Sequence, residues 1–141
     1  MTDSIEEIVE RMRRNWPDVS ADQAREVMSL TRRTRLLQEA AQTALKAFSL
    51  TRSEFELLAA LRSHDPPHIL TPTDLYDAIL MSSGGLTKLL KGMEARGLVS
   101  RPAGEGDGRS KPIQLTHAGC DLVEKAMPAV QEAEALLLAK R

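Results

Sequence analysis

The sequence predicts a mainly α-helical fold with one small β-hairpin, and three observations support this class. Apolar residues recur every three or four positions through most of the 141 residues, which is the spacing of amphipathic helices. The chain has only one Trp, one Tyr and two Phe, so its core must be mostly aliphatic, which suits helix packing. The pattern changes only at residues 98–115, where two strand-like runs enclose a glycine-rich loop. A chain of this length forms one domain, or one domain with arms.

The N-terminal part predicts a short helix followed by a long one. The short helix covers residues 4–14 and ends at Pro17. Ser20, with Gln23 three residues later, caps the next helix, which extends to about residue 48 because residues 21–48 contain neither Gly nor Pro. A helix of that length in a small protein usually packs across a partner chain or extends over a domain boundary. Its seam, with steps of three and four, consists of Val27, Leu30, Thr34, Leu37, Ala41, Ala44 and Phe48.

The next part of the chain predicts two shorter helices with recognisable starts. Thr51 opens the first as the N-cap of a capping box with Glu54, and this helix stops before residues 65–67. Residues 71–74 begin the second with an N-cap threonine, a proline at the first helical position and an acidic side chain in the first turn.

A third helix, over residues 82–96, carries the pattern that points to function. Ser82 or Ser83 caps its start, and Gly97 is well placed as a left-handed C-cap. One face is apolar and consists of Leu86, Leu89, Leu90 and Met93. The other face is polar and cationic, with no acidic residue before Glu94, and it presents Gly84, Thr87, Lys88 and Lys91. Glycines at 84 and 85 cost roughly 1 kcal/mol each, and either close approach to a ligand or a loose first turn explains them.

Two short strands and a last helix follow. Residues 98–102 and 111–115 read as strands, with prolines that favour a sheet edge. Thr116 caps the last helix, and Pro128 is expected to kink or break it. The apolar face of this helix consists of Leu122, Ala126, Val130, Ala133 and Leu137. Residues 51–115 therefore have the order of a winged helix-turn-helix, three helices and then a hairpin.

The distribution of charge indicates a local basic surface. Residues 82–116 hold six basic and three acidic side chains, a net charge of +3 within a chain whose net charge is −1. The excess lies on the third helix and the hairpin, where such a fold would touch DNA, and Lys and Thr can donate to phosphates and base edges. The polar face can also be interpreted without any function, because a pair of lysines on a helix surface usually does no more than contact water.

Other function classes find little support in the sequence. We expect no catalytic residues, no cofactor and no metal site: His64 and His68 are separated by residues 65–67, and His117 with Cys120 is a weak candidate for a metal or redox site. The single cysteine fits a reducing cytoplasm, and we expect neither a signal peptide nor a membrane span. A winged helix that contacts only proteins remains the alternative to a DNA-binding protein.

Residues 50–119 resemble the MarR family of transcriptional regulators. The resemblance consists of successive short segments in family order, including residues 50–61, 70–75 and 82–88. It continues through 94–101, the Asp107-Gly-Arg109 motif and 115–119. Each segment alone is a weak signal, but all of them together, in this order, are a strong signal for the family.

The resemblance implies a cytoplasmic homodimer that binds a pseudo-palindromic operator in double-stranded DNA. Residues 1–49 and 117–141 would form the dimer, although their apolar seams could also pack on the chain's own core, and residues 50–116 would bind DNA. Arg109, braced by Asp107, would reach a minor groove or its phosphates. The expected DNA-binding residues are Thr71, Thr73, Ser82, Ser83, Gly84, Thr87, Lys88, Lys91, Arg109, Ser110 and Lys111.

A finer resemblance connects the chain to the urate-responsive members of the family, which hold an anionic purine with a Trp, an Asp and two Arg. Trp16 and Arg101 match two of these positions, whereas Glu56 replaces the Asp and Leu89 replaces the second Arg. The absence of one cation argues against urate and favours a different small aromatic or anionic effector, held near Trp16, Glu56 and Arg101. Trp16 could equally be a hydrophobic plug between subunits.

Overall fold

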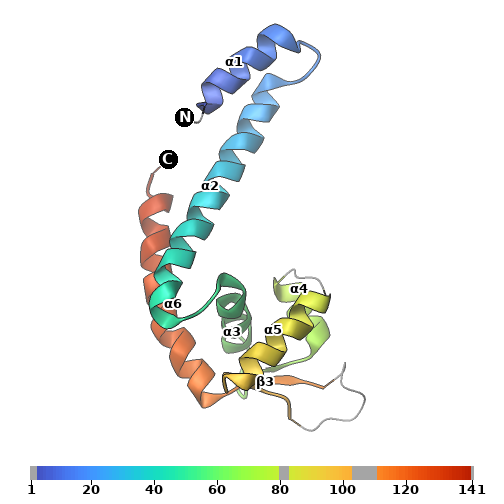
Figure 1. Cartoon of the computed structure of the whole chain (residues 1–141), viewed down its shortest axis with the longest axis vertical. Coiled ribbons are helices and arrows are strands. Elements are labelled where there is room, and N and C mark those ends of the chain that lie inside the picture. The colour runs from blue at the N-terminus through green and yellow to red at the C-terminus, as the bar shows by residue number, and fades with distance from the viewer. Residues whose placement is uncertain (1–2, 80–82, 103–110, 141) are drawn as a thin grey trace. The chain divides into compact units, whose positions relative to one another are not determined.

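The computed structural model describes residues 3–79, 83–102 and 111–140, without the exposure of residues 83 and 84 (Figure 1). The chain divides into two compact units, Met1–Glu39 and Ala40–Arg141. The boundary falls within the long helix α2 (Ala21–Leu45). Each unit is described by itself below.

The first unit is a pair of helices joined by ion pairs. α1 (Ile5–Asn15) begins in a capping box between Ser4 and Glu7 and buries Val9. Arg25 of α2 donates two hydrogen bonds to the Glu6 carboxylate, at 2.8 and 3.0 Å. The predicted N-cap of α2 is confirmed, since the Ser20 hydroxyl oxygen accepts a hydrogen bond from the Gln23 amide at 3.2 Å.

The apolar seam of α2 is covered only toward its C-terminal end. Ala41 is buried and Ala44 packs against the core, whereas Val27 is 54% and Leu30 59% exposed. The seam therefore starts as an uncovered apolar surface in the single chain, which is what a helix that packs on a partner would present.

The second unit contains the remaining elements. After α2, a short 3-10 helix η1 (Lys46–Phe48) leads to α3 (Arg52–Ser63), β1 (Ile69–Leu70) and α4 (Pro72–Ile79). These are followed by α5 (Ser83–Ala95), β2 (Val99–Ser100), β3 (Ile113–Leu115) and α6 (His117–Leu138). The predicted capping box of α3 is confirmed, because Thr51 and Glu54 bond each other reciprocally.

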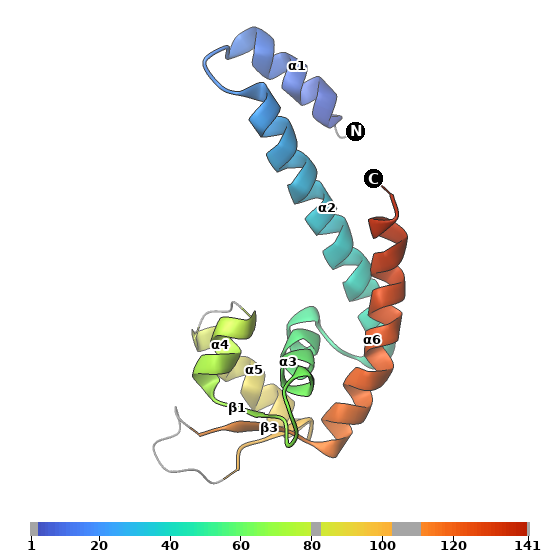
Figure 2. The ribbon, with the colours of Figure 1, turned by 180° about the vertical axis from the view of Figure 1, so that it is seen from behind.

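The strands form a three-stranded antiparallel sheet in the order β1-β3-β2 (Figure 2). Ile69 is paired with Gln114 on one side of β3, and Val99 with Leu115 on the other. The expectation of a hairpin alone was therefore incomplete, because β1 adds a third strand. Two residues are too few to show the alternation by which a strand is recognised in a sequence.

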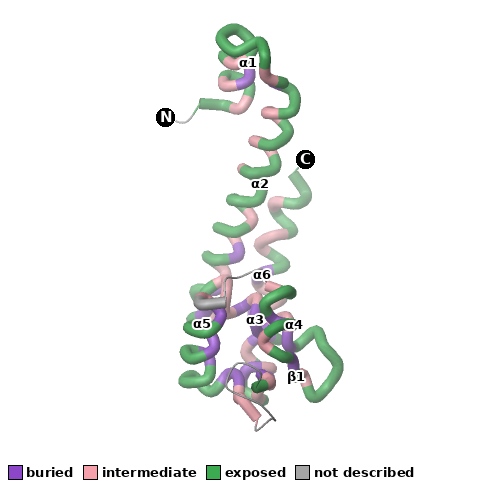
Figure 3. The backbone as a smooth tube through the Cα atoms, turned by 90° about the vertical axis from the view of Figure 1, so that its right-hand side faces the viewer, coloured by how far each residue is buried: buried purple, intermediate pink, exposed green. Residues whose placement is uncertain are grey.

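The core of this unit surrounds α3. Leu57, Leu58 and Leu61 have no exposed surface, and they belong to one apolar cluster with Leu75 of α4 and Met93 of α5. Figure 3 shows the buried positions concentrated in this part of the backbone. The core is therefore mostly aliphatic, as the scarcity of aromatic residues in the sequence predicts.

α6 runs without interruption through Pro128, so of the expected kink or break at this residue, the break is wrong. Proline removes one helical hydrogen bond. Pro128 and Glu124, four residues earlier, are both exposed, so the missing hydrogen bond lies on the solvent side of the helix. Buried Ala126 and Val130 on either side of Pro128 hold both halves of the helix on the core.

Candidate nucleic-acid interface

The C-terminus of α5 is fixed by a left-handed glycine, as predicted. Gly97 has a φ of +73°, and its amide donates to the Glu94 carbonyl at 2.9 Å. The Leu98 amide donates to the Met93 carbonyl at 3.0 Å. These two bonds form a Schellman motif, which ends the helix and turns the chain into β2.

The two faces of α5 separate as the sequence predicts. Leu86, Leu90 and Met93 are buried in the core cluster, and Leu89 is half-buried against it. Thr87, Lys88 and Lys91 are exposed. These three polar residues therefore lie on the solvent side of the helix, opposite its buried face, and residues of these types can contact phosphates and bases.

α4 contributes exposed polar side chains close to its start. The Thr71 hydroxyl oxygen accepts a hydrogen bond from the Asp74 amide at 3.2 Å, so Thr71 is the N-cap of this helix. Thr73 is exposed. Tyr76, one turn later, is 41% exposed and adds an aromatic ring to this surface that the sequence pattern does not indicate.

The remaining residues expected to bind DNA are only partly described. Ser82, Arg109 and Ser110 lie outside the described residues, as does Asp107. Ser83 and Gly84 lie in the first turn of α5, but their exposure is not described. Lys111 is exposed just before β3.

The three residues expected to hold an effector are distributed over the chain. Trp16 belongs to the first unit and is 59% exposed. Arg101, just after β2, donates from Nη2 to the Lys111 carbonyl at 2.8 Å, so its guanidinium connects the two arms of the wing. Glu56 lies on α3, four residues from Arg52, whose Nε is 4.0 Å from the Glu56 carboxylate.

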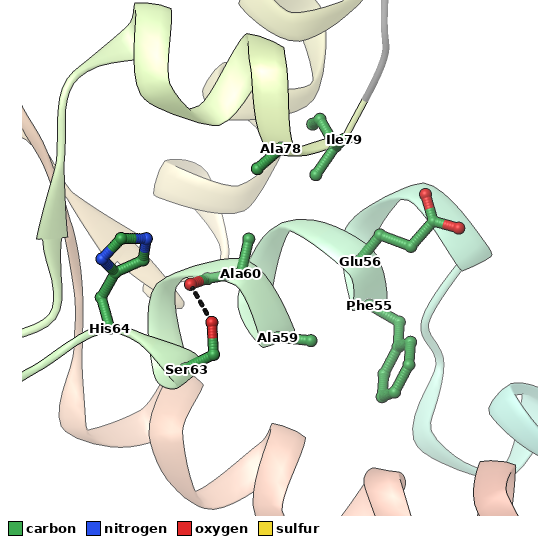
Figure 4. Close-up of a pocket in the computed structure, with 8 residues that line it drawn as sticks. All are labelled: Phe55, Glu56, Ala59, Ala60, Ser63, His64, Ala78 and Ile79. Carbon is green, nitrogen blue, oxygen red and sulfur yellow. Dashed lines mark hydrogen bonds between the residues drawn. The ribbon is translucent and has the colours of Figure 1, made fainter.

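Glu56 lines an open groove of about 520 Å³ between α3 and α4 (Figure 4). Ala78 and Ile79 of α4 form one side of it in this view, and α3 forms the other. The described lining is mostly apolar, with Glu56 as its only acidic side chain and no lysine or arginine. It consists of Phe55, Glu56, Ala59, Ala60, Ser63, His64, Ala78 and Ile79.

Two ion pairs connect α3 to its neighbours, and no sequence pattern indicates either of them. At the start of α3, the Glu54 carboxylate accepts a hydrogen bond of 2.8 Å from Nη1 of Arg96, the residue that follows the end of α5. At its other end, Arg62 Nε lies 3.0 Å from Glu124 of α6. These partners are 42 and 62 residues apart in sequence, so only the fold brings them together.

Cys120 lies beside the second of these ion pairs and shares its carboxylate. Its thiol donates to the Glu124 carboxylate at 3.3 Å. Burial, and then the bond to Glu124, raise the pKa of the Cys120 thiol above its ordinary value. Since the thiolate is the reactive form, this environment opposes redox sensing. Among the described residues there is also no group of three His, Cys, Asp or Glu side chains that could hold a metal ion.

We expect Cys120 to react slowly with Ellman's reagent in the folded protein, with a rate that rises only above the pH typical of a free thiol. Glu124→Gln should speed the reaction at a given pH, because it removes the negative charge that disfavours the thiolate. Stopped-flow measurement of the rate against pH, with the urea-unfolded protein as the reference, tests this. A Glu124→Gln profile that coincides with the parent's would contradict the assignment.

None of the described helices has the length and apolar character that a membrane crossing requires.

The helices α3, α4 and α5, followed by a small sheet and with an exposed basic face on α5, define a winged helix-turn-helix protein. Comparison with known proteins places it more narrowly. A model described as "MarR family" matches residues 48–110.

Relatives and solved structures agree with this match. The HTH-type transcriptional regulator PecS of Dickeya dadantii is 29% identical over 123 residues, which cover 87% of this chain and 74% of PecS. The HTH-type transcriptional repressor Mb2911 of Mycobacterium bovis is 32% identical over 105 residues, 74% of this chain and 73% of that protein. The Mycobacterium tuberculosis MarR family protein RV2887, solved with salicylic acid, is 30% identical with a TM-score of 0.63, over 79% of this chain and 81% of that one. The chain belongs to the MarR family of DNA-binding transcriptional regulators.

Proposed function

We propose that this regulator represses transcription by binding a pseudo-palindromic operator as a homodimer, with α5 of each subunit in a major groove. The observation that carries the proposal is the exposed Thr87, Lys88 and Lys91 face on a helix whose opposite face is buried. A face of this kind can donate to phosphates and bases without disturbing the core. Binding of chromosomal DNA would also place the protein in the cytoplasm.

An operator with two symmetric half-sites requires a second copy of the chain, and the exposed apolar residues of the α2 seam support the formation of such a dimer. Val27 and Leu30 are more than half exposed, and so are Leu136 and Leu138 at the end of α6. Apolar surface on α2 and α6 is costly in a monomer, and burial between subunits would remove it from water. Residues 1–49 and 117–141 would then serve as dimerisation segments, and residues 50–116 as the DNA-binding module.

The groove between α3 and α4 is our candidate for the effector site. Its apolar alanine and isoleucine walls suit a flat aromatic molecule, which fits the finer resemblance to urate-responsive regulators. The described lining includes Glu56 but no lysine or arginine, and Leu89 stands where those regulators have a second Arg. We therefore favour a neutral or weakly basic aromatic effector over urate or another anion. Roles for Trp16 and Arg101 in its binding remain predictions.

The salt dependence of DNA binding tests the proposed function. Fluorescence anisotropy would follow binding to a labelled duplex from the region upstream of the gene and to a scrambled duplex. We expect preference for the upstream duplex, and a slope of log K against log salt of roughly −4 or steeper, because phosphate contacts release counterions. A winged helix that contacts only proteins would show neither the preference nor the slope.

The effect of small compounds on DNA binding tests the effector proposal. We expect a neutral or weakly basic aromatic compound to weaken binding of the upstream duplex, with purines and aromatic acids as the comparison set. A change in Trp16 emission would add support for the role of Trp16 that the finer resemblance implies. Glu56→Gln should reduce the affinity for a basic effector but not for a neutral one. If no compound in the panel weakens binding of the duplex, the groove is not an effector site of this kind.

A further inference from the structure

Glu54 uses its two carboxylate oxygens for two different purposes. Oε1 accepts a hydrogen bond from the Thr51 amide at 2.8 Å and thereby completes the capping box of α3. Oε2 accepts a hydrogen bond from Arg96 Nη1, also at 2.8 Å. The Glu54 side chain is only 15% exposed, so this pair is better shielded from water than the other ion pairs of the chain's described part. The capping bond holds the carboxylate in one orientation, and this orientation sets the position of the oxygen to which the Arg96 guanidinium bonds.

Arg96 occupies the point at which α5 becomes the wing. Its amide donates to the Gly92 carbonyl at 3.1 Å, which is still a helical bond. The next residue, Gly97, is left-handed and leads into Leu98 and β2. A bond from Arg96 to α3 therefore holds the C-terminal end of α5 and the first residue of the wing connection together.

Apolar packing alone leaves some freedom to a helix of this size. Leu86, Leu90 and Met93 set the distance of α5 from the core, but contacts between aliphatic side chains are not directional. A charge-assisted hydrogen bond between a guanidinium and a carboxylate does have a preferred direction. At one end of the helix, such a bond restricts rotation about the helix axis, which decides where Thr87, Lys88 and Lys91 point.

We propose that Glu54 is a positioning residue for DNA recognition: through Arg96 it fixes the rotation of α5 and so aligns the exposed basic face with the operator. This inference rests on the proposed DNA-binding function. It concerns a carboxylate that touches no DNA and that lies on a different helix from the residues that do.

Two other roles for the pair predict different results. If Glu54 acted only through its charge, its removal would strengthen DNA binding, because a negative charge near a basic surface repels phosphates. If Glu54 served only the stability of α3, its removal would lower the melting temperature and leave the affinity of the folded protein unchanged. A positioning role predicts weaker operator binding with little change in melting temperature.

The test is Glu54→Gln in the full-length protein, because glutamine also completes a capping box but cannot form an ion pair with Arg96. We expect a 3- to 10-fold loss of affinity for the upstream duplex, a smaller loss for a scrambled duplex, and a melting temperature within about 3 °C of the parent. Arg96→Gln should produce a similar loss without touching the capping box. The double variant should lose little more than either single variant, since both break the same bond.

Glu124→Gln is the matched control, because it breaks an ion pair of similar length between α3 and α6. It should leave the affinity for the upstream duplex unchanged. The proposal is overturned if Glu54→Gln binds as tightly as the parent or more tightly, or if Arg96→Gln alone weakens binding, which would mean that Arg96 contacts a phosphate itself. If the parent protein does not bind DNA, it is the proposed function that fails.

Discussion

Replacing Gly119 with alanine is expected to destabilise the protein by about 3 kcal/mol or more, a loss on the order of 10 °C in melting temperature. A Cβ atom at this position would lie 2.1 Å from the Leu98 carbonyl oxygen and 2.8 Å from Leu115 Cδ1. The first of these contacts is with backbone, so no side-chain rotation can relieve it. Either α6 or the start of β2 must move.

The surrounding hydrogen bonds make such a movement expensive. The Leu98 carbonyl already accepts from the Thr116 amide at 3.2 Å, and the Thr116 hydroxyl donates to the Gly97 carbonyl at 2.7 Å. The same hydroxyl oxygen caps α6 by accepting from the Gly119 amide at 3.0 Å. A shift large enough to admit the methyl group would strain these bonds together, which is why the cost should exceed that of an ordinary overpacked site.

Gly92→Ala provides the matched control, since nothing lies within 4 Å of a Cβ atom at that position. Alanine favours a helix interior over glycine, so this variant should gain roughly 0.5–1 kcal/mol. Thermal unfolding followed by circular dichroism measures both. Similar melting temperatures for the two variants would show that the close approach of α6 to β2 is not rigid.

The features predicted correctly from the sequence are local ones. Thr51 with Glu54, Ser20 with Gln23, and the Gly97 C-cap each involve residues within a few positions of one another, and backbone chemistry alone fixes their geometry. The buried and exposed faces of α5 follow for the same reason, because helical periodicity sorts side chains once a helix forms.

The features that were missed or wrong depend on interactions between distant parts of the chain. Nothing near Ile69 indicates that β3 will pair with it, and nothing near Glu54 indicates a bond to Arg96. The continuity of α6 through Pro128 is decided by Ala126 and Val130 packing on the core, which outweighs the local preference of proline. Likewise, the steric need for Gly119 appears only when Leu98 is placed beside it.

The double variant Lys88→Ala, Lys91→Ala is expected to lower the affinity for the upstream duplex by about 100-fold or more at 0.1 M salt. Both side chains are exposed on α5, and the substitutions would remove four ammonium groups from a dimer. Each phosphate interaction that is lost should make the slope of log K against log salt less steep by about 1, so the loss of all four should make it less steep by about 4. Binding isotherms at four or five salt concentrations separate this effect from a decrease in folded protein, which would lower the active fraction but leave the slope unchanged.

Lys46→Ala and Lys125→Ala are the matched controls, because both lysines are exposed in the same unit but on other elements. They should change the affinity by less than about twofold, since neither is expected to bind a phosphate. Arg109→Ala extends the test to the chain segment between β2 and β3, where we expect a loss of affinity comparable to that of one α5 lysine. If the double variant and Arg109→Ala both bind like the parent while the scrambled duplex is still rejected, another surface of the protein reads the operator, and Thr73 and Tyr76 on α4 become the first residues to substitute.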